Sequence, residues 1–338
     1  MRALERLGHE VRLVYHRTPQ PGDLEHYLSE DLRGNAPLLL ESDEGRRALM
    51  EVIFYNVAAE FRPELILLAG IYYTWSSDAL ADVEDNLGVP VILWSGDNPY
   101  VPNAPDIFER APYYRSVLFA NFRFADRAAD RFAHTDYLPF GCDPTRDLPP
   151  EATDELDPYG CDLSYLGTYK EERAQLLDTL ASRDFEMKVW GVGYPDDFAR
   201  RFANLAAVLQ PEHVQGREKI KVYGGSKIVL NLHHTGFANM KLYEAAACGA
   251  FQISNKRLEA ESTRHRLGLC DEMVTYERPE ELVELIDYYL SHPQQRASRA
   301  RRLRELVLAE HTWDQRMASI LALVAPSPAP RTTLEPTS

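Results

Sequence analysis

The stretch KIVLNLHHTGFANMKLYEAAACGAFQISN, residues 227–255, contains one complete strand–helix–strand unit. KIVLNLHH is a continuous apolar run typical of a buried strand, and AFQISN is typical of a second strand. Between them, Asn239 is a good N-cap for the helix MKLYEAAAC, and Gly249 follows in the usual C-cap role. Continuous apolar strands that alternate with helices favour a parallel sheet covered on both faces.

The same alternation extends over most of the chain. Apolar runs predict strands at 11–15, 63–70, 89–99, 161–167 and 185–191, and helical spacing predicts helices at 44–61, 77–87, 170–182 and 313–324. Pro279 is expected to open a further helix, as proline does at a first helical position. We therefore predict an α/β chain with two doubly wound domains that face a cleft.

A stretch dense in proline and acidic residues separates the two predicted domains. The segment GCDPTRDLPPEATDELDPYG, residues 141–160, has the composition of a linker. We place the N-terminal domain at 1–148, the C-terminal domain at 149–312 and a last helix at 313–324. The tail 325–338 is polar and proline-rich, and it is expected to be disordered.

Composition excludes several classes of protein. The chain has 338 residues, of which 45% are hydrophobic and 26% charged, as in soluble globular proteins. A net charge of −15 opposes binding to nucleic acid or anionic lipid. No run approaches eighteen apolar residues, and the N-terminus has charges where a signal peptide needs an apolar core, so we expect a cytoplasmic protein without an integral membrane segment. The four cysteines have no CxxC spacing, which indicates unpaired buried thiols and no metal site.

Two loops that follow predicted strands have features of anion sites. In LGTYKEER, residues 166–173, Gly167 and Thr168 lead into a helix, and Arg173 lies nearby. Backbone N–H groups and the helix dipole favour an anion there, although an ordinary strand-to-helix turn has the same pattern. In WGVGY, residues 190–194, Gly191 would allow a ligand to approach the backbone, or it serves a tight turn.

Three further side chains are candidates for chemistry. Glu244 lies in the alanine-rich helix of the opening stretch, where a carboxylate suits the vicinal hydroxyls of a ribose; the alternatives are a solvated side chain or one paired with Lys241. Asp97 follows a strand in WSGDNPY, where it serves as a base or only shapes an Asx turn before Pro99. His233 and His234 end a strand and are candidates for contact with phosphate, although one of them can be simply a strand-end residue. We predict catalytic roles for Asp97 and His233.

At this point the residues resemble a known family. The ordered motifs DLSYLGTY, VWGVG, VYGGSKIVLNLHH, NMKLYEAAACGAF, VTYERPEELVELIDYYLSHP and EHTWDQR resemble the CgeB-like (spore maturation protein) glycosyltransferases, which are related to retaining family 4 enzymes of the GT-B fold. The resemblance covers about residues 160–323. In the first half, GVPVILWSGDNP is a weaker match.

The resemblance implies a hexosyltransferase that transfers a sugar from a nucleotide sugar, such as a UDP sugar, to a glycan, protein or small-molecule acceptor. It implies that the C-terminal domain binds the donor and the N-terminal domain binds the acceptor. By position, Glu244 resembles the carboxylate that holds the donor ribose, and Asn239 and Lys241 face the donor. Gly167, Thr168 and Arg173 resemble the turn that faces the diphosphate. No cofactor and no metal are expected, because cationic side chains and helix N-termini stabilise the leaving diphosphate.

The sequence departs from the family pattern at two places. Retaining family 4 enzymes have a second glutamate eight residues before the ribose-binding one, and here that position is Gly236. The chain also begins within what looks like the first helix, RALERLGHEV, so we expect an upstream segment that supplies the first strand and a glycine loop. These departures favour an alternative, a catalytically inactive protein that binds a nucleotide or glycan in a maturation complex. A sugar-nucleotide epimerase needs more acid and base residues, and a dehydrogenase needs a GxGxxG that the chain lacks.

Overall fold

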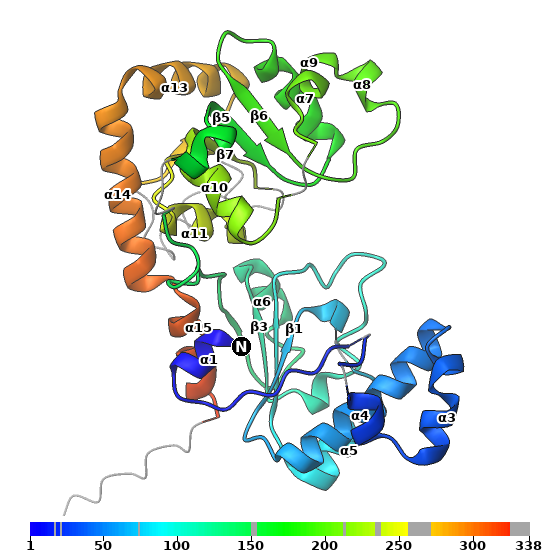
Figure 1. The fold of residues 1–338 in the computed structure, drawn as a ribbon. Helices are drawn as coiled ribbons and strands as arrows, with labels where there is room; N and C mark the ends of the chain where they lie inside the picture. The colour runs from blue at the N-terminus through cyan, green and yellow to red at the C-terminus, as the bar shows by residue number, and fades with distance from the viewer. Residues whose placement is uncertain are drawn as a thin grey trace, which may run out of the picture. The chain divides into compact units, whose positions relative to one another are not determined.

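A computed structural model describes residues 1–16, 18–20, 22–73, 75–149, 154–211, 214–233, 238–255 and 272–324. The chain divides into two compact units, each with its own sheet (Figure 1). The first unit comprises Met1–Phe119, Arg123–Leu138 and Met317–Ser338, and the second comprises Ala120–Phe122 and Pro139–Arg316. The division after Leu138 lies ten residues before the boundary that we placed at 148.

The first unit is built on a parallel sheet of four strands in the order β1-β2-β3-β4. The strands are β1 (Ile66–Ala69), β2 (Val91–Ser95), β3 (Ser116–Phe119) and β4 (Thr135–Tyr137). The helices are α1 (Arg2–Arg6), α2 (Asp23–Tyr27), α3 (Glu30–Leu39), α4 (Asp43–Phe61), α5 (Ser77–Leu87) and α6 (Phe122–Ala128). Short 3-10 helices occupy Ile71–Tyr73 and Ala111–Tyr113.

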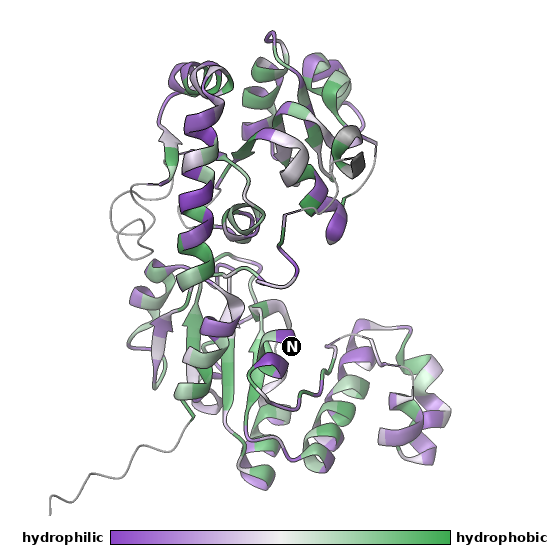
Figure 2. Ribbon diagram, turned by 60° about the vertical axis from the view of Figure 1, so that its left-hand side comes forward, coloured by the Kyte–Doolittle hydropathy of each residue, from purple (hydrophilic) through white to green (hydrophobic). Residues whose placement is uncertain are grey.

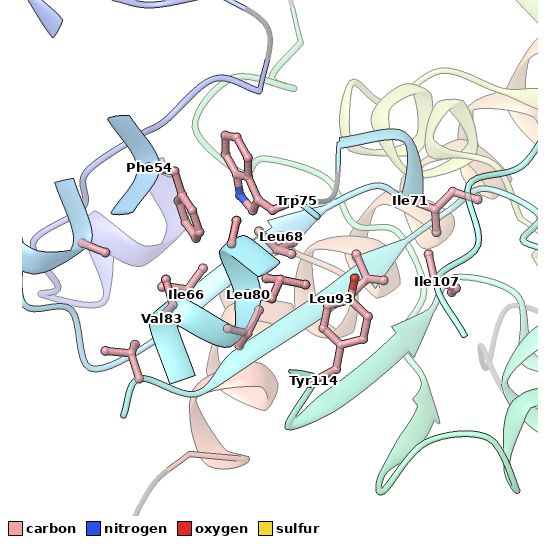
Figure 3. Packing of buried hydrophobic residues seen from close by; sticks show 14 of the residues in the cluster. Phe54, Ile66, Leu68, Ile71, Trp75, Leu80, Val83, Leu93, Ile107 and Tyr114 are labelled. Carbon is pink, nitrogen blue, oxygen red and sulfur yellow. The ribbon is translucent and has the colours of Figure 1, made fainter. Parts of the chain in front are cut away.

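A hydrophobic core joins α4 and α5 to this sheet (Figure 3). Phe54 of α4 stacks on Trp75 with ring centroids 4.5 Å apart, and Leu80 and Leu93 are fully buried beside them. The central strands β2 and β3 are mostly hydrophobic and buried (Figure 2), as expected for strands of a parallel sheet that is covered on both faces. This packing positions the loop after β2, which carries Asp97.

The strand predicted at residues 11–15 is wrong. These residues form no strand, and Leu13 and Tyr15 are exposed. Only Val14 packs against the core, while the neighbouring Arg12 donates a hydrogen bond to Asp23. High local strand propensity does not produce a strand unless another strand supplies backbone partners. The strands β3 and β4 were not predicted, because β3 has an apolar run of only three residues, 117–119, and β4 (TDY) has none.

The second unit contains a parallel sheet of five strands in the order β6-β5-β7-β8-β9. The strands are β5 (Cys161–Leu166), β6 (Met187–Trp190), β7 (Ser226–Asn231), β8 (Gln252–Asn255) and β9 (Val274–Tyr276). The helices are α7 (Glu171–Ala181), α8 (Phe198–Arg201), α9 (Ala203–Val208), α10 (Arg217–Gly225), α11 (Met240–Ala247), α13 (Pro279–Ser291), α14 (Pro293–Glu310) and α15 (Trp313–Ala322), the last of which is divided between the units. A 3-10 helix occupies Asp154–Tyr159.

Helices cover both faces of the second sheet, as predicted. Ile228 and Leu230 pack into one core with residues of α7 and α13, while Val229 packs on the opposite face with residues of α10 and α11. This alternation follows from the period of two along a strand. The predicted N-cap at Asn239 is confirmed, because its side chain accepts a hydrogen bond from the backbone N of Leu242 at 3.1 Å. Pro279 begins α13, also as predicted.

The buried state that we predicted for the cysteines is confirmed where the structure describes them. Cys142, Cys161 and Cys248 are buried free thiols. Cys270 lies outside the described residues. Burial in apolar surroundings raises the pKa of Cys142 to about 12 and that of Cys161 to about 11, so both thiols stay protonated at neutral pH.

Candidate functional site

The order of the second sheet reverses at its centre, between β5 and β7. From β5 the chain moves outward to β6, and it then returns to the other side of β5 and continues through β7, β8 and β9. In open α/β sheets, ligands bind outside the carboxyl ends of the strands at such a point of reversal. The loops that begin at Gly167, after β5, and at Leu232, after β7, therefore define the candidate site.

The loops after β5 and β6 contact each other through their backbones. The backbone N of Gly167 donates to the carbonyl O of Trp190 at 3.0 Å, and that of Tyr169 donates to Val192 at 2.8 Å. A Cβ added at Gly191 would lie 2.2 Å from the carbonyl O of Gly167. Close packing of the two loops therefore accounts for the glycine at 191. Ligand binding by Gly167, Thr168 and Gly191 stays a prediction.

Two cationic side chains lie at the carboxyl end of β5. Lys241 Nζ donates to the carbonyl O of Leu166 at 2.6 Å and lies 5.5 Å from the centre of the Tyr165 ring. Arg173 donates to the Tyr165 hydroxyl at 3.1 Å. Burial, together with the nearby Arg173 charge, lowers the pKa of Lys241 to about 8. A second positive charge close to a buried ammonium makes this a place where an anion would be stabilised.

A hydrogen-bond network joins the end of β7 to the start of α11. The side chains of Asn231 and Asn239 exchange two hydrogen bonds, at 2.8 and 3.2 Å. The imidazole Nδ1 of His233 accepts from the backbone N of Asn239 at 3.3 Å, while Asn255 accepts from the backbone N of His233 and donates to its carbonyl O. Because Nδ1 accepts, the neutral ring carries its proton on Nε2. His233 is 1% exposed, and its predicted catalytic role stays a prediction.

Glu244 is buried and forms an ion pair with a residue that the sequence analysis did not single out. Its exposed fraction is 7%, and Oε1 accepts from Lys219 Nζ of α10 at 2.7 Å. The alternatives of a solvated or Lys241-paired Glu244 are therefore wrong, because Lys241 turns to Leu166 instead. Within the described residues, Oε2 of Glu244 has no hydrogen-bond partner although it is buried. A buried charged oxygen without a partner is costly, so a further hydrogen-bond donor would be stabilised there.

More ionisable groups surround this pair. Burial raises the pKa of Asp147, and the charge of Glu244 acts in the same direction. Burial, and then Glu244, hold the pKa of Tyr223 well above its usual value. The Tyr223 hydroxyl, like Glu244 Oε2, is buried and has no hydrogen-bond partner among the described residues. Neither Lys219 nor Asp147 has a sequence signal of its own, since Lys221 and the other acids of the predicted linker look the same locally.

Asp97 belongs to the first unit. It is exposed, and its backbone N donates to Ser95 Oγ at 3.0 Å. The Asn98 side chain accepts from the backbone N of Tyr100 at 2.9 Å, so an Asx turn does surround Pro99. Desolvation by the protein raises the pKa of the Asp97 carboxyl. Its predicted catalytic role stays a prediction, and Gly236 and His234 lie outside the described residues.

Over the described ranges, no three His, Cys, Asp or Glu side chains are grouped so that they could hold a metal ion. In the same part of the chain, no helix has both the length and the apolar character to cross a membrane. Metal independence of the chemistry stays a prediction.

The comparisons with known proteins agree with this architecture. Residues 172–322 match a family model described as glycosyl transferase-like. No curated protein sequence matches the chain. Among solved structures, the chain is similar to a sucrose-phosphate synthase from Thermosynechococcus elongatus, with 13% identity, a TM-score of 0.60 and coverage of 82% of this chain and 77% of that one.

A second similar structure is a UDP-forming α,α-trehalose-phosphate synthase from Burkholderia xenovorans. The identity is 11% and the TM-score 0.55, and the match covers 84% of this chain and 79% of that one. A third similar structure is the N-terminal domain of a trehalose-6-phosphate phosphatase from Candida albicans, with 11% identity and a TM-score of 0.57. This match covers 90% of this chain and 78% of that one. At such identities these matches show the fold alone. The predicted α/β fold of the GT-B type, with Rossmann-like units, is confirmed.

Proposed function

We propose that the protein is a glycosyltransferase that moves a sugar from a UDP sugar to a glycan, protein or small-molecule acceptor. The family model over residues 172–322 supports sugar transfer, and the description of one similar structure as UDP-forming supports UDP as the nucleotide. The observation that carries the proposal is the buried Glu244, whose second oxygen lacks a partner among described residues, at the point of reversal of the sheet. We also propose that the protein is a CgeB-like enzyme in particular.

Each site residue has a role in the proposed reaction. Glu244 accepts hydrogen bonds from the ribose, while Lys241 and Arg173 stabilise the negative charge that develops on the diphosphate as its bond to the sugar breaks. The acceptor hydroxyl forms the new bond to the sugar and gives its proton to a base, for which we propose Asp97. The raised pKa of that carboxyl makes it a better proton acceptor. His233 and Asn239 are bonded to each other between the end of β7 and the start of α11, and we propose that both lie near the donor.

A nucleotide screen followed by a hydrolysis assay tests this function. We expect UDP and UDP sugars to raise the melting temperature more than GDP or ADP conjugates do. With the preferred donor and no acceptor, slow release of UDP is expected, and EDTA should not reduce it. Stabilisation by no nucleotide would contradict the proposal.

The second candidate function is binding without transfer. It is favoured by Gly236, which replaces the donor-sugar glutamate of the family pattern. Such a protein would be stabilised by UDP sugars but would release no UDP above the rate of the donor alone. The same hydrolysis assay therefore distinguishes the two functions.

Lys241 predicts a pH dependence of nucleotide binding. Because the pKa of Lys241 is about 8, its ammonium is present below that pH and is lost as the pH rises through it. The diphosphate is fully ionised above pH of about 7, so UDP affinity should fall between pH 7.5 and 9.5, by up to about tenfold per pH unit. Calorimetric titration of UDP over this range measures the effect.

Two variants complete this test. Lys241→Met should bind UDP more weakly and without this pH dependence. Lys227→Met should keep the pH dependence. Lys227 pairs with Asp162 at the amino ends of β7 and β5, whereas Lys241 lies at the carboxyl end of β5. If Lys241→Met retains the pH dependence of the unmodified protein, the titrating group is not Lys241.

A further inference from the structure

In the ion pair between α10 and α11, only one of the two carboxylate oxygens of Glu244 accepts a hydrogen bond from a described residue. Oε1 accepts from Lys219 Nζ at 2.7 Å, and the Lys219 side chain is only 20% exposed. Oε2 is buried, and no described residue forms a hydrogen bond with it. The side chain is therefore held on one side by the protein and has its second oxygen left for another donor.

The contact with Lys219 is not required by the local structure of either helix. Glu244 lies in the second turn of α11, and Lys219 lies in the first turn of α10, 25 residues earlier. Lys221, two residues further along α10, points elsewhere and pairs with Glu218 at 3.6 Å. Only one of the two lysines on this helix thus reaches the carboxylate, at a site that Tyr223 and Asp147 also face.

A buried carboxylate needs both charge compensation and a fixed orientation to recognise a hydroxyl pair. Lys219 supplies the compensating charge, because without it Glu244 would lie near the acidic Asp147 with no cation bonded to it. It also restricts rotation of the carboxyl group, since one oxygen is committed to a charge-assisted hydrogen bond. Pre-orientation of this kind lowers the entropy cost of binding a ligand.

We propose that Lys219 is a positioning residue that orients Glu244 toward the ribose hydroxyls of the donor nucleotide. The inference rests on the proposed function and assigns Lys219 no contact with the nucleotide. It follows that Lys219 controls how strongly the protein distinguishes a ribonucleotide from a deoxynucleotide. We expect loss of Lys219 to affect recognition of the base and the diphosphate much less than recognition of the ribose, because Lys241 and Arg173 bond to residues of β5.

The test compares three nucleotides, UDP, 2′-deoxy-UDP and 3′-deoxy-UDP. A hydrogen bond to a charged group contributes about tenfold to a hundredfold in affinity, so the unmodified protein should bind at least one deoxynucleotide weaker than UDP by about that factor. In Lys219→Met this difference should fall to about threefold or less, with the affinity for that deoxynucleotide nearly unchanged. Lys221→Met, on the same helix, should keep the full difference.

Lys219→Arg tests the inference further, because it keeps the charge and the fold-stabilising contact. It should restore part of the discrimination that Lys219→Met loses. Equal weakening of all three nucleotides by Lys219→Met, or full discrimination in that variant, would overturn the positioning role. If instead the unmodified protein binds UDP and both deoxynucleotides alike, or binds none of them, the proposed donor site itself fails, and the role of Lys219 fails with it.

Discussion

Glu244→Ala should weaken binding of UDP and UDP sugars by about 100-fold or more, because the carboxylate that accepts charge-assisted hydrogen bonds from the ribose is lost. The ammonium of Lys219 then keeps its position but loses its partner. Donor hydrolysis should fall in parallel, since the donor is no longer held. Isothermal titration with UDP and the UDP-release assay measure the two effects.

Glu244→Gln separates the charge of this residue from its shape. Glutamine can still accept from Lys219 through its amide oxygen, but it presents an NH₂ group or a neutral oxygen to the ribose. We expect a loss in affinity between that of the unmodified protein and that of Glu244→Ala. Glu284→Gln, an exposed change on α13, is the matched control and should have no effect. Tight UDP binding by Glu244→Ala would show that the nucleotide lies elsewhere.

Gly191→Ala should destabilise the second unit by about 3 kcal/mol, because a methyl group added there overlaps backbone atoms. Its Cβ would lie 2.2 Å from the carbonyl O of Gly167 and 3.1 Å from the Tyr194 hydroxyl. This carbonyl lies in the chain between the two backbone N–H groups, of Gly167 and Tyr169, that join the loops after β5 and β6, so moving it should strain both hydrogen bonds. Urea unfolding, followed by tryptophan fluorescence, measures the change.

Gly193→Ala is the matched control in the same loop. A Cβ at Gly193 would make only an ordinary contact, 3.5 Å from the Thr168 side chain, but φ is 80° there. The left-handed conformation should cost about 1–2 kcal/mol for alanine. A destabilisation by Gly191→Ala no larger than that by Gly193→Ala would mean that the two loops can separate without loss.

The cationic and the acidic side chains of the candidate site are proposed to bind different parts of the donor. Lys241 and Arg173 lie beside Tyr165 at the end of β5, where a diphosphate would be stabilised. Glu244 and Lys219 join α11 to α10, where a ribose would be held. Both pairs lie within the second unit, so nucleotide binding should depend on this unit alone.

Local sequence signals predicted most of the second sheet and its helices. Asn239 caps α11 and Pro279 opens α13, because capping and proline effects act between residues that are neighbours in the chain. The strand predicted at residues 11–15 was wrong, because a strand is stable only with neighbouring strands, and the local sequence does not specify those.

The amino-acid sequence by itself determined the alternation of strands and helices, and with it the α/β class and the place of Glu244 on a helix after a buried strand. Only the tertiary structure decided which cation Glu244 meets. Lys241 is three residues away on the same helix, yet it bonds to Leu166, while Lys219 comes from another helix. Helix periodicity is set by bonds within four residues, whereas an ion pair depends on distances in space that arise only when the elements pack together.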